Sequence, residues 1–133
     1  MRNIPLILSK EDYKLLADQY ASASIPAFNK HKLFVELMDA KIVTKQYIPL
    51  NVVSSTSDVL ISNIKKHQTF SIHIMPAGDQ QPGTNNIPVT DPLVIALLGY
   101  PAGAETEWEM KDGVNKLKII SVDSAGRAVD GGR

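Results

Sequence analysis

The sequence predicts an α+β fold, in which a short antiparallel helical hairpin (a two-helix coiled coil) precedes an antiparallel β domain with one short helix. Three observations predict it. Apolar residues recur at helical spacing through the first 43 residues, the period changes towards two from residue 58, and residues 91–99 resemble a short capped helix. We expect the hairpin over residues 1–47, the β domain over 48–123 and a flexible tail over 124–133.

The first helix is predicted to begin after Ser9. Its hydroxyl can accept a hydrogen bond from a free backbone N–H, and Glu11 and Asp12 suit the positive end of the helix dipole. An apolar stripe at helical spacing follows, formed by Tyr13, Leu16, Ala17 and Tyr20. Residues 4–8 precede this helix as a short strand or an extended lead-in.

A second helix is predicted from about Pro26 to Val43, since proline is tolerated in a first helical turn. Its apolar positions are Leu33, Phe34, Leu37, Met38 and Ile42. The short connection should fold the two helices back antiparallel. We expect four acids of the hairpin to be solvated or to cap helix ends: Glu11, Asp12, Glu36 and Asp39.

Beyond a linker over residues 45–51, the sequence predicts about five strands, at 58–64, 69–75, 87–90, 105–110 and 117–122. Alternation places Phe70, Ile72 and Ile74 on one face of the second strand and turns Trp108 inward. Residues 76–86 read as a loop, because they hold two Pro, two Gly and polar side chains. The pair Asp112-Gly113 predicts the last hairpin turn, since it accepts positive φ.

The segment from Asp91 to Gly99 predicts a short helix. Asp91 can cap it, Pro92 suits its first position, and Gly99 suits the residue beyond its end.

Composition excludes several function classes. Lys plus Arg and Asp plus Glu both number 14, so the positive excess that drives direct nucleic-acid binding is missing. No cysteine is present, and no signal peptide or membrane span is evident, which predicts a cytoplasmic protein that does not contact the membrane. The three histidines, at 31, 67 and 73, match no metal motif, and no nucleotide-binding or nucleophile motif occurs. We therefore expect no cofactor, no metal and no enzyme activity.

The tip of the hairpin carries apolar residues. Ile25 and Phe28 either close the hairpin's own core or form a contact patch for a partner. A tip that delivers a metal ion would need paired carboxylates, whereas this tip holds only Asp18 and is followed by Lys30, His31 and Lys32. A metal-delivering tip is therefore disfavoured.

The segment Asp91-Pro92-Leu93-Val94-Ile95-Ala96-Leu97-Leu98-Gly99 resembles the C-terminal domain of the GreA/GreB transcription factors. In that family an Asp-Pro or Ser-Pro opens a short helix ending in Ala-Leu-Leu-Gly, and two strands close the domain. The Rnk branch (regulator of nucleoside diphosphate kinase) is most similar. The segments that carry this likeness are Glu36-Leu37-Met38-Asp39-Ala40-Lys41, Ile48-Pro49-Leu50-Asn51-Val52-Val53-Ser54 and Asp58-Val59-Leu60-Ile61.

The resemblance implies an FKBP-like β domain and binding to RNA polymerase near the mouth of the secondary channel. It places Asp91, Pro92 and Leu93 on the contact surface. Gre factors carry an acidic tip that holds a metal for transcript cleavage, and the tip here departs from that pattern. We therefore expect polymerase binding without cleavage stimulation. Ala104 also departs, since the family commonly has Asp there.

Two alternatives stay open at this point. An FKBP-like prolyl isomerase would need an aromatic pocket, for which the β domain offers only Phe70, Tyr100 and Trp108. Direct binding to nucleoside diphosphate kinase is neither supported nor excluded by any residue. The oligomeric state does not follow from the sequence, and a monomer is the working expectation.

Overall fold

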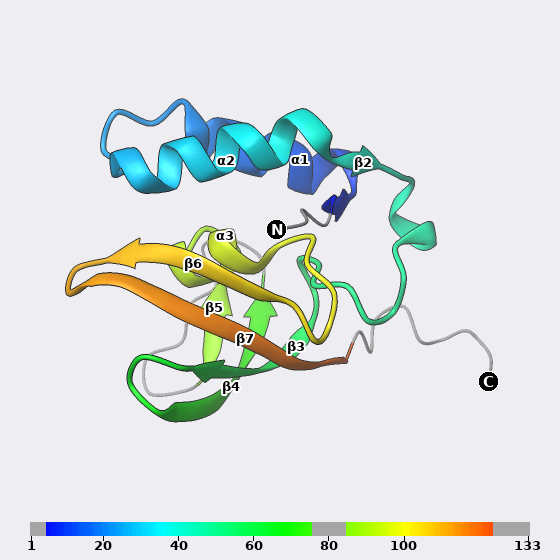
Figure 1. Cartoon of the computed structure of the whole chain (residues 1–133). Coiled ribbons are helices and arrows are strands. Elements are labelled where there is room, and N and C mark those ends of the chain that lie inside the picture. The colour runs from blue at the N-terminus through cyan, green and yellow to red at the C-terminus, as the bar shows by residue number, and fades with distance from the viewer. Residues whose placement is uncertain (1–4, 76–84, 124–133) are drawn as a thin grey trace.

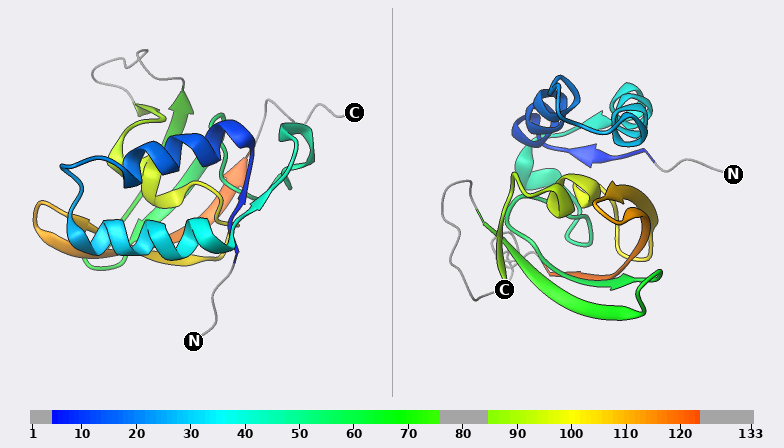
Figure 2. Two further views of the ribbon diagram at one scale, coloured as in Figure 1. Left: turned by 90° about the horizontal axis from the view of Figure 1, so that it is seen from above. Right: turned by 90° about the vertical axis from the view of Figure 1, so that its left-hand side faces the viewer.

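The computed structural model describes residues 5–75 and 85–123. Two helices lie side by side over a curled sheet, and a third, short helix lies between the helical pair and the sheet (Figures 1 and 2). The α+β fold class predicted from the sequence is therefore confirmed. The predicted flexible tail, and most of the predicted loop over residues 76–86, lie outside the described residues.

The N-terminal part begins with strand β1 (Ile7–Leu8), followed by α1 (Lys10–Tyr20) and α2 (Ala27–Asp39). Ser9 caps α1 as predicted, since its Oγ accepts a hydrogen bond from the Asp12 backbone N–H at 3.1 Å. The two helices pack through Leu16 and Leu33, which are fully buried. The antiparallel hairpin is thus formed by the apolar stripes that the sequence displays.

The predicted end of the second helix is wrong. The helix stops at Asp39, and Lys41–Ile42 form strand β2, which pairs parallel with β1. The backbone N–H of Lys41 donates to Leu6 O at 2.8 Å, and that of Val43 donates to Leu8 O at 2.9 Å. A partner strand far away in the sequence therefore overrides the helical spacing. A one-turn 3-10 helix, η1 (Lys45–Tyr47), follows.

Five strands form the main sheet, in the order β5-β4-β3-β7-β6. They are β3 (Asp58–Asn63), β4 (Gln68–Met75), β5 (Asn86–Pro88), β6 (Glu105–Met110) and β7 (Gly113–Asp123). The sheet is mixed rather than wholly antiparallel, because β5 runs parallel to β4. A tight turn between two strands would force antiparallel pairing. Residues 76–85, which connect β4 to β5, are too many for a tight turn.

Helix α3 (Pro92–Leu97) lies between the helical pair and the sheet, and its residues Val94, Ile95, Ala96 and Leu97 are buried. The Asp91 side chain caps it by accepting a hydrogen bond from the Leu93 N–H at 2.9 Å. Gly99 follows with φ of 87°. The cap, the leading proline and the closing glycine all stand where the sequence predicts them.

One hydrophobic core joins the hairpin to the sheet. Leu6, Leu8, Leu16 and Leu33 are packed in the same cluster as residues of α3 and of the sheet. The helices therefore lie flat against the β domain and do not project from it as a separate arm. Within the part of the chain that the structure describes, no helix is long and apolar enough to cross a membrane.

Candidate partner-binding groove

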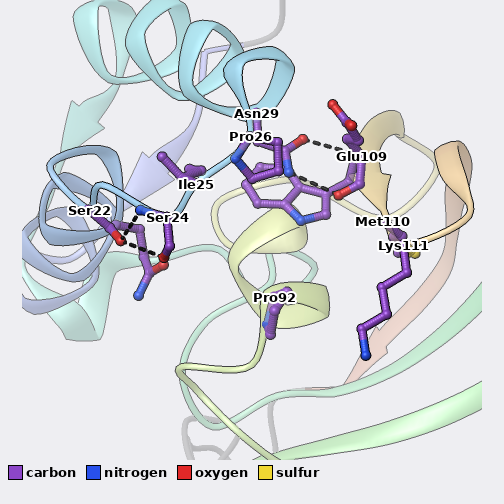
Figure 3. A pocket seen from close by; sticks show the side chains of 11 residues that line it. Ser22, Ser24, Ile25, Pro26, Asn29, Pro92, Glu109, Met110 and Lys111 are labelled. Atoms are coloured by element: carbon purple, nitrogen blue, oxygen red, sulfur yellow. Dashed lines mark hydrogen bonds between the residues drawn. The ribbon is translucent and has the colours of Figure 1, made fainter.

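An open groove of about 420 Å³ lies where three parts of the chain meet. These are the connection between α1 and α2, the beginning of α3, and the tip of the β6–β7 hairpin (Figure 3). Eleven residues line it: Gln19, Ser22, Ser24, Ile25, Pro26, Asn29, Pro92, Trp108, Glu109, Met110 and Lys111. Segments that are far apart in the sequence therefore build this site together.

The groove has apolar walls and a polar rim. Ile25, Pro26, Pro92 and Met110 supply apolar surface, and Trp108, only 3% exposed, anchors the wall on β6. Figure 3 shows Pro92 lying between the hairpin tip and the β6–β7 tip. An apolar hollow with a few polar groups around it is the usual form of a binding site in proteins.

Asn29 holds the two sides of the groove together. Its side-chain amide donates to Glu109 O at 3.0 Å, and its Oδ1 accepts from the Glu109 N–H at 2.7 Å. Both partners are backbone groups of β6, the edge strand of the sheet. Asn29 is 1% exposed. Its two hydrogen bonds occupy backbone groups of an edge strand that would otherwise be free to pair with another strand. This contact therefore joins α2 to β6 at the groove.

A second polar contact lies further along α2. Lys32 Nζ bonds Glu36 Oε2 at 2.6 Å, and the Tyr100 hydroxyl also donates to Glu36. Burial lowers the pKa of Lys32, and burial together with the Glu36 charge raises the pKa of Tyr100. The expectation that Glu36 is a solvated acid is therefore wrong, because its carboxylate joins α2 to Tyr100, three residues beyond the end of α3.

Asp12 also departs from that expectation. It is 4% exposed, and burial raises the pKa of its carboxyl, opposed by the charge of Lys45 and by a hydrogen bond from the backbone of Ser55. Its side chain therefore ties the start of α1 to the segment that leads into β3. The other two acids, Glu11 and Asp39, are exposed as expected.

The structure brings together some of the residues predicted to contact a partner. Pro92, which is exposed, and Ile25, which is half-buried, line the same groove. Asp91 is half-buried and caps α3, while Leu93 packs against the core. Phe28 is 40% exposed on α2 and does not line the groove. The predicted set therefore divides into a groove pair, a cap, a core residue and a separate surface residue.

Sequence reasoning missed Asn29, Met110 and Lys111 as parts of this surface. The alternating pattern of β6 predicts that Trp108 points inward, but it does not indicate which residues Trp108 contacts. One signal was available, since Asn29 precedes Leu33 by four residues and so shares its buried helix face. A polar residue on a buried face requires a partner. Nothing in the sequence identifies that partner as the backbone of Glu109.

Metal chemistry receives no support from the described residues. Within residues 5–75 and 85–123, no group of three or more His, Asp or Glu side chains comes close enough to hold an ion. His31, His67 and His73 are exposed, and His73 is hydrogen-bonded to Asp58.

Comparisons with known proteins identify the chain's relatives. A family model described as transcription elongation factor, GreA/GreB, C-term matches residues 48–124. The GreA protein of Helicobacter hepaticus is 27% identical over 122 residues, which cover 90% of this chain and 75% of that protein. The GreA protein of Clostridium acetobutylicum is 28% identical over 86 residues, 65% of this chain and only 54% of that protein.

A solved structure of a GreA/GreB transcription elongation factor from Nitrosomonas europaea has the same fold. It superposes with a TM-score of 0.63 at 26% identity and covers 91% of this chain and 99% of its own. The matched family region contains α3, β6 and the turn that follows β6, which supply one side of the groove. The chain therefore belongs to the GreA/GreB family of transcription elongation factors through its residues 48–124.

Proposed function

We propose that this chain is a cytoplasmic transcription regulator of the Rnk type. It binds RNA polymerase near the secondary channel through the groove and the adjoining Asp91-Pro92-Leu93 segment. One observation carries this proposal. The family region presents Pro92 and the β6–β7 tip at an apolar groove, whose other side is the tip of the helical hairpin. The relatives' description as transcription elongation factors supports the same partner.

Binding takes place without stimulation of transcript cleavage. The segment between α1 and α2, residues 21–26, contains no acidic residue. The acid nearest to it on α1, Asp18, pairs with Lys14 at 3.3 Å. Two carboxylates that share a metal ion would be needed to assist hydrolysis at a partner's active site. With 11 residues at about 1.5 Å each, α1 is also only about 16 Å long.

Binding is tested with purified core RNA polymerase and three variants. Lys111→Glu changes the exposed rim, Pro92→Asp places a charge in the apolar wall, and Asp91→Asn removes a charge while keeping an oxygen that can cap α3. We expect Lys111→Glu and Pro92→Asp to weaken binding by about tenfold or more. Ile120→Ala, at an exposed position of β7 that does not line the groove, serves as the matched control. Unchanged binding in both groove variants would sink the groove as the docking site.

Cleavage is tested separately with arrested transcription complexes. The expected result is that the chain leaves the transcripts intact and, in excess, suppresses their shortening by a GreA protein. Shortening of transcripts by this chain alone would contradict the proposal. Binding without competition would place the chain elsewhere on the polymerase.

The two alternatives have their own tests. The groove contains Trp108 but neither Phe70 nor Tyr100, so it offers a prolyl substrate one aromatic wall. A peptide isomerisation assay with the purified chain checks this activity, and we expect no rate above the uncatalysed one. Direct regulation of nucleoside diphosphate kinase is checked by titrating the purified kinase with the chain and measuring both binding and phosphoryl transfer.

A further inference from the structure

The turn between β3 and β4 and the turn between β6 and β7 form a basic end of the sheet. Residues 64–67 and 111–112 make up these two turns, which we call the twin turn. They carry three exposed lysines, Lys65, Lys66 and Lys111, against a single acid, Asp112. The chain as a whole has a formal net charge of zero, so the twin turn holds a local excess of positive charge.

Two buried asparagines lock the two turns together. Asn63 and Asn115 are 5% and 0% exposed, and the Asn63 side-chain amide donates to Asn115 Oδ1 at 3.1 Å. Asn115 in turn donates to Asp112 Oδ1 at 2.8 Å and to Gly113 O at 3.0 Å. The backbone N–H of Lys66 donates to Asn63 Oδ1 at 3.1 Å. Breaking these bonds would leave buried polar groups unpaired, so the twin turn presents its lysines from a rigid base.

The carboxylate of Asp112 does not neutralise all three lysines. Its Oδ2 pairs with Lys66 Nζ at 3.0 Å, and its Oδ1 accepts from Asn115. Lys65 Nζ donates to the backbone carbonyl of Asp112 at 3.2 Å, which is an uncharged acceptor. Among the described residues, no carboxylate lies within ion-pair distance of Lys65 or Lys111. Two ammonium groups of the twin turn are therefore available to carboxylates of a partner.

Lys111 belongs to both the twin turn and the groove, which it lines beside Met110. Figure 3 shows its side chain extending away from the Asn29–Glu109 contact, whereas the Glu109 carboxylate points the other way. The apolar groove and the basic twin turn are thus continuous through Lys111. A single bound segment can touch both surfaces.

The chemistry of this joined surface favours a polypeptide over a nucleic acid. Proteins that bind single-stranded nucleic acid combine a basic track with aromatic rings on which bases stack. Trp108 is the one aromatic residue that lines the groove, and it is only 3% exposed. Apolar walls instead fit the apolar side chains of a protein. Lysines beside such walls match carboxylates on the same protein.

We propose that the groove and the twin turn bind one segment of the partner, which places an apolar side chain in the groove and carboxylates against Lys65 and Lys111. This inference rests on the proposed function, because it takes RNA polymerase as the partner, and it adds the chemistry of the bound segment. Exposed charge pairs are screened by salt, whereas apolar contacts are not. The affinity should therefore fall as the salt concentration rises.

Binding of purified core RNA polymerase at a series of salt concentrations tests the charges. The double variant Lys65→Gln/Lys111→Gln removes both available ammonium groups at exposed positions. At about 50 mM salt it should bind about fivefold or more weakly than the wild type, and this difference should shrink towards about 500 mM. Lys10→Gln/Lys41→Gln makes the same charge change at exposed positions outside both surfaces, and it should bind like the wild type.

The possible failures are distinguishable. An unchanged affinity, a loss that is equal at every salt concentration, or an equal loss in the Lys10→Gln/Lys41→Gln control would overturn this inference while polymerase binding itself stands. No binding of the wild-type chain at any salt concentration would end the proposed function and this inference together. Binding to a labelled single-stranded RNA of about 20 nucleotides, lost in Lys65→Gln/Lys111→Gln, would assign the twin turn to nucleic acid and overturn the inference.

Cross-linking tests whether one segment touches both surfaces, and it is specific because the chain has no cysteine. Ser24→Cys, at the groove, and Val114→Cys, beside the twin turn, each receive a photo-reactive label and are bound to core polymerase. Both labels should attach within about ten residues of one another, in a stretch that contains Asp or Glu side chains. Labels on two remote segments, or on a stretch without acids, would overturn the inference.

Discussion

A few buried polar side chains make the most specific contacts between the parts of this molecule. Asn29 and Asp12 are 1% and 4% exposed, and each joins a helix to a segment that is remote in the sequence. Apolar contacts tolerate many arrangements of similar volume. A buried hydrogen bond tolerates few, because an unpaired donor or acceptor loses its hydration without compensation. These residues therefore determine how the hairpin sits on the β domain.

Replacing Asn29 by Ala should destabilise the chain by about 1–3 kcal/mol, because both backbone groups of Glu109 lose their partners. Urea denaturation followed by Trp108 fluorescence measures this loss. The exposed Asn51 is the matched control, and its replacement by Ala should change the free energy of unfolding by less than about 0.5 kcal/mol. Equal losses in the free energy of unfolding at Asn29 and Asn51 would show that the hydrogen bonds of Asn29 do not stabilise the fold.

The buried carboxyl of Asp12 should make the free energy of unfolding depend on pH, in a direction that its raised pKa fixes. Burial raises the pKa of its carboxyl in the folded state above the ordinary value of 3.8. The folded state therefore favours the protonated form. The contribution of the protonated carboxyl to the free energy of unfolding is fully present below pH 3.8, and it is lost as pH rises through the raised pKa.

Asp12→Asn mimics the protonated carboxyl, so its free energy of unfolding should lack that fall. Denaturation of both proteins at a series of pH values checks the difference between them. Parallel pH profiles would show that Asp12 titrates as it does in the unfolded chain. Asp39→Asn, at an exposed position, is the control and should run parallel to the wild type.

At the scale of elements, two short pieces of chain hold the larger ones in place. Strand β1 pairs with β2, and the Ile7 N–H also donates to Gly99 O at 3.2 Å, directly after α3. Gly99 lies so close to β1 that an added Cβ would approach the Leu8 side chain to 2.8 Å and the Leu6 Cβ to 2.9 Å. The absence of a side chain here lets α3 end against the N-terminal strand.

Two glycines give a matched pair that separates backbone strain from crowding. Gly99 and Gly103 have φ of 87° and 92°, yet an added Cβ at Gly103 would meet nothing within 4 Å. Gly103→Ala should cost about 1 kcal/mol through strain alone. Gly99→Ala should cost about 1–3 kcal/mol more, since overpacking is added. Thermal unfolding of the two variants checks this, and equal losses would count against the tight contact with β1.

At the scale of the whole molecule, the hairpin and the β domain share one core. Leu33 from α2 is packed in the same cluster as Trp108 from β6. The groove is a product of that packing, because neither the hairpin tip nor the β6–β7 tip forms it alone. A surface composed of both parts keeps its shape only while they stay docked.

A shared core predicts one cooperative unfolding transition. The signal of Trp108 fluorescence, from the sheet, and helical circular dichroism, mostly from the hairpin, should follow the same curve in urea. Leu33→Ala should move both curves together and cost about 2–5 kcal/mol, because the cavity opens in the common core. Separate transitions, with helical signal lost first, would show that the hairpin folds as an independent unit.

The sequence by itself determined the elements whose signals are local. The Ser9 and Asp91 caps, the closing Gly99 and the alternation around Trp108 all depend on residues within a few positions of one another. These local rules apply before the chain folds, so α1, α3 and β6 could be predicted almost to the residue, whereas β7 begins at Gly113, four residues before the predicted start at Leu117. The candidate residues Pro92 and Ile25 were also identified, although not as neighbours.

Only the tertiary structure decided what depends on distant partners. Strand β2 ends the second helix because β1 supplies hydrogen bonds, and β5 runs parallel because a long connection allows it. Asn29 finds the backbone of Glu109 across 80 positions in the sequence. The groove and the exposed face of α2 likewise depend on which side of each element is buried in the core. Local propensity cannot encode that choice, because it depends on the free energy of burial summed over the whole chain.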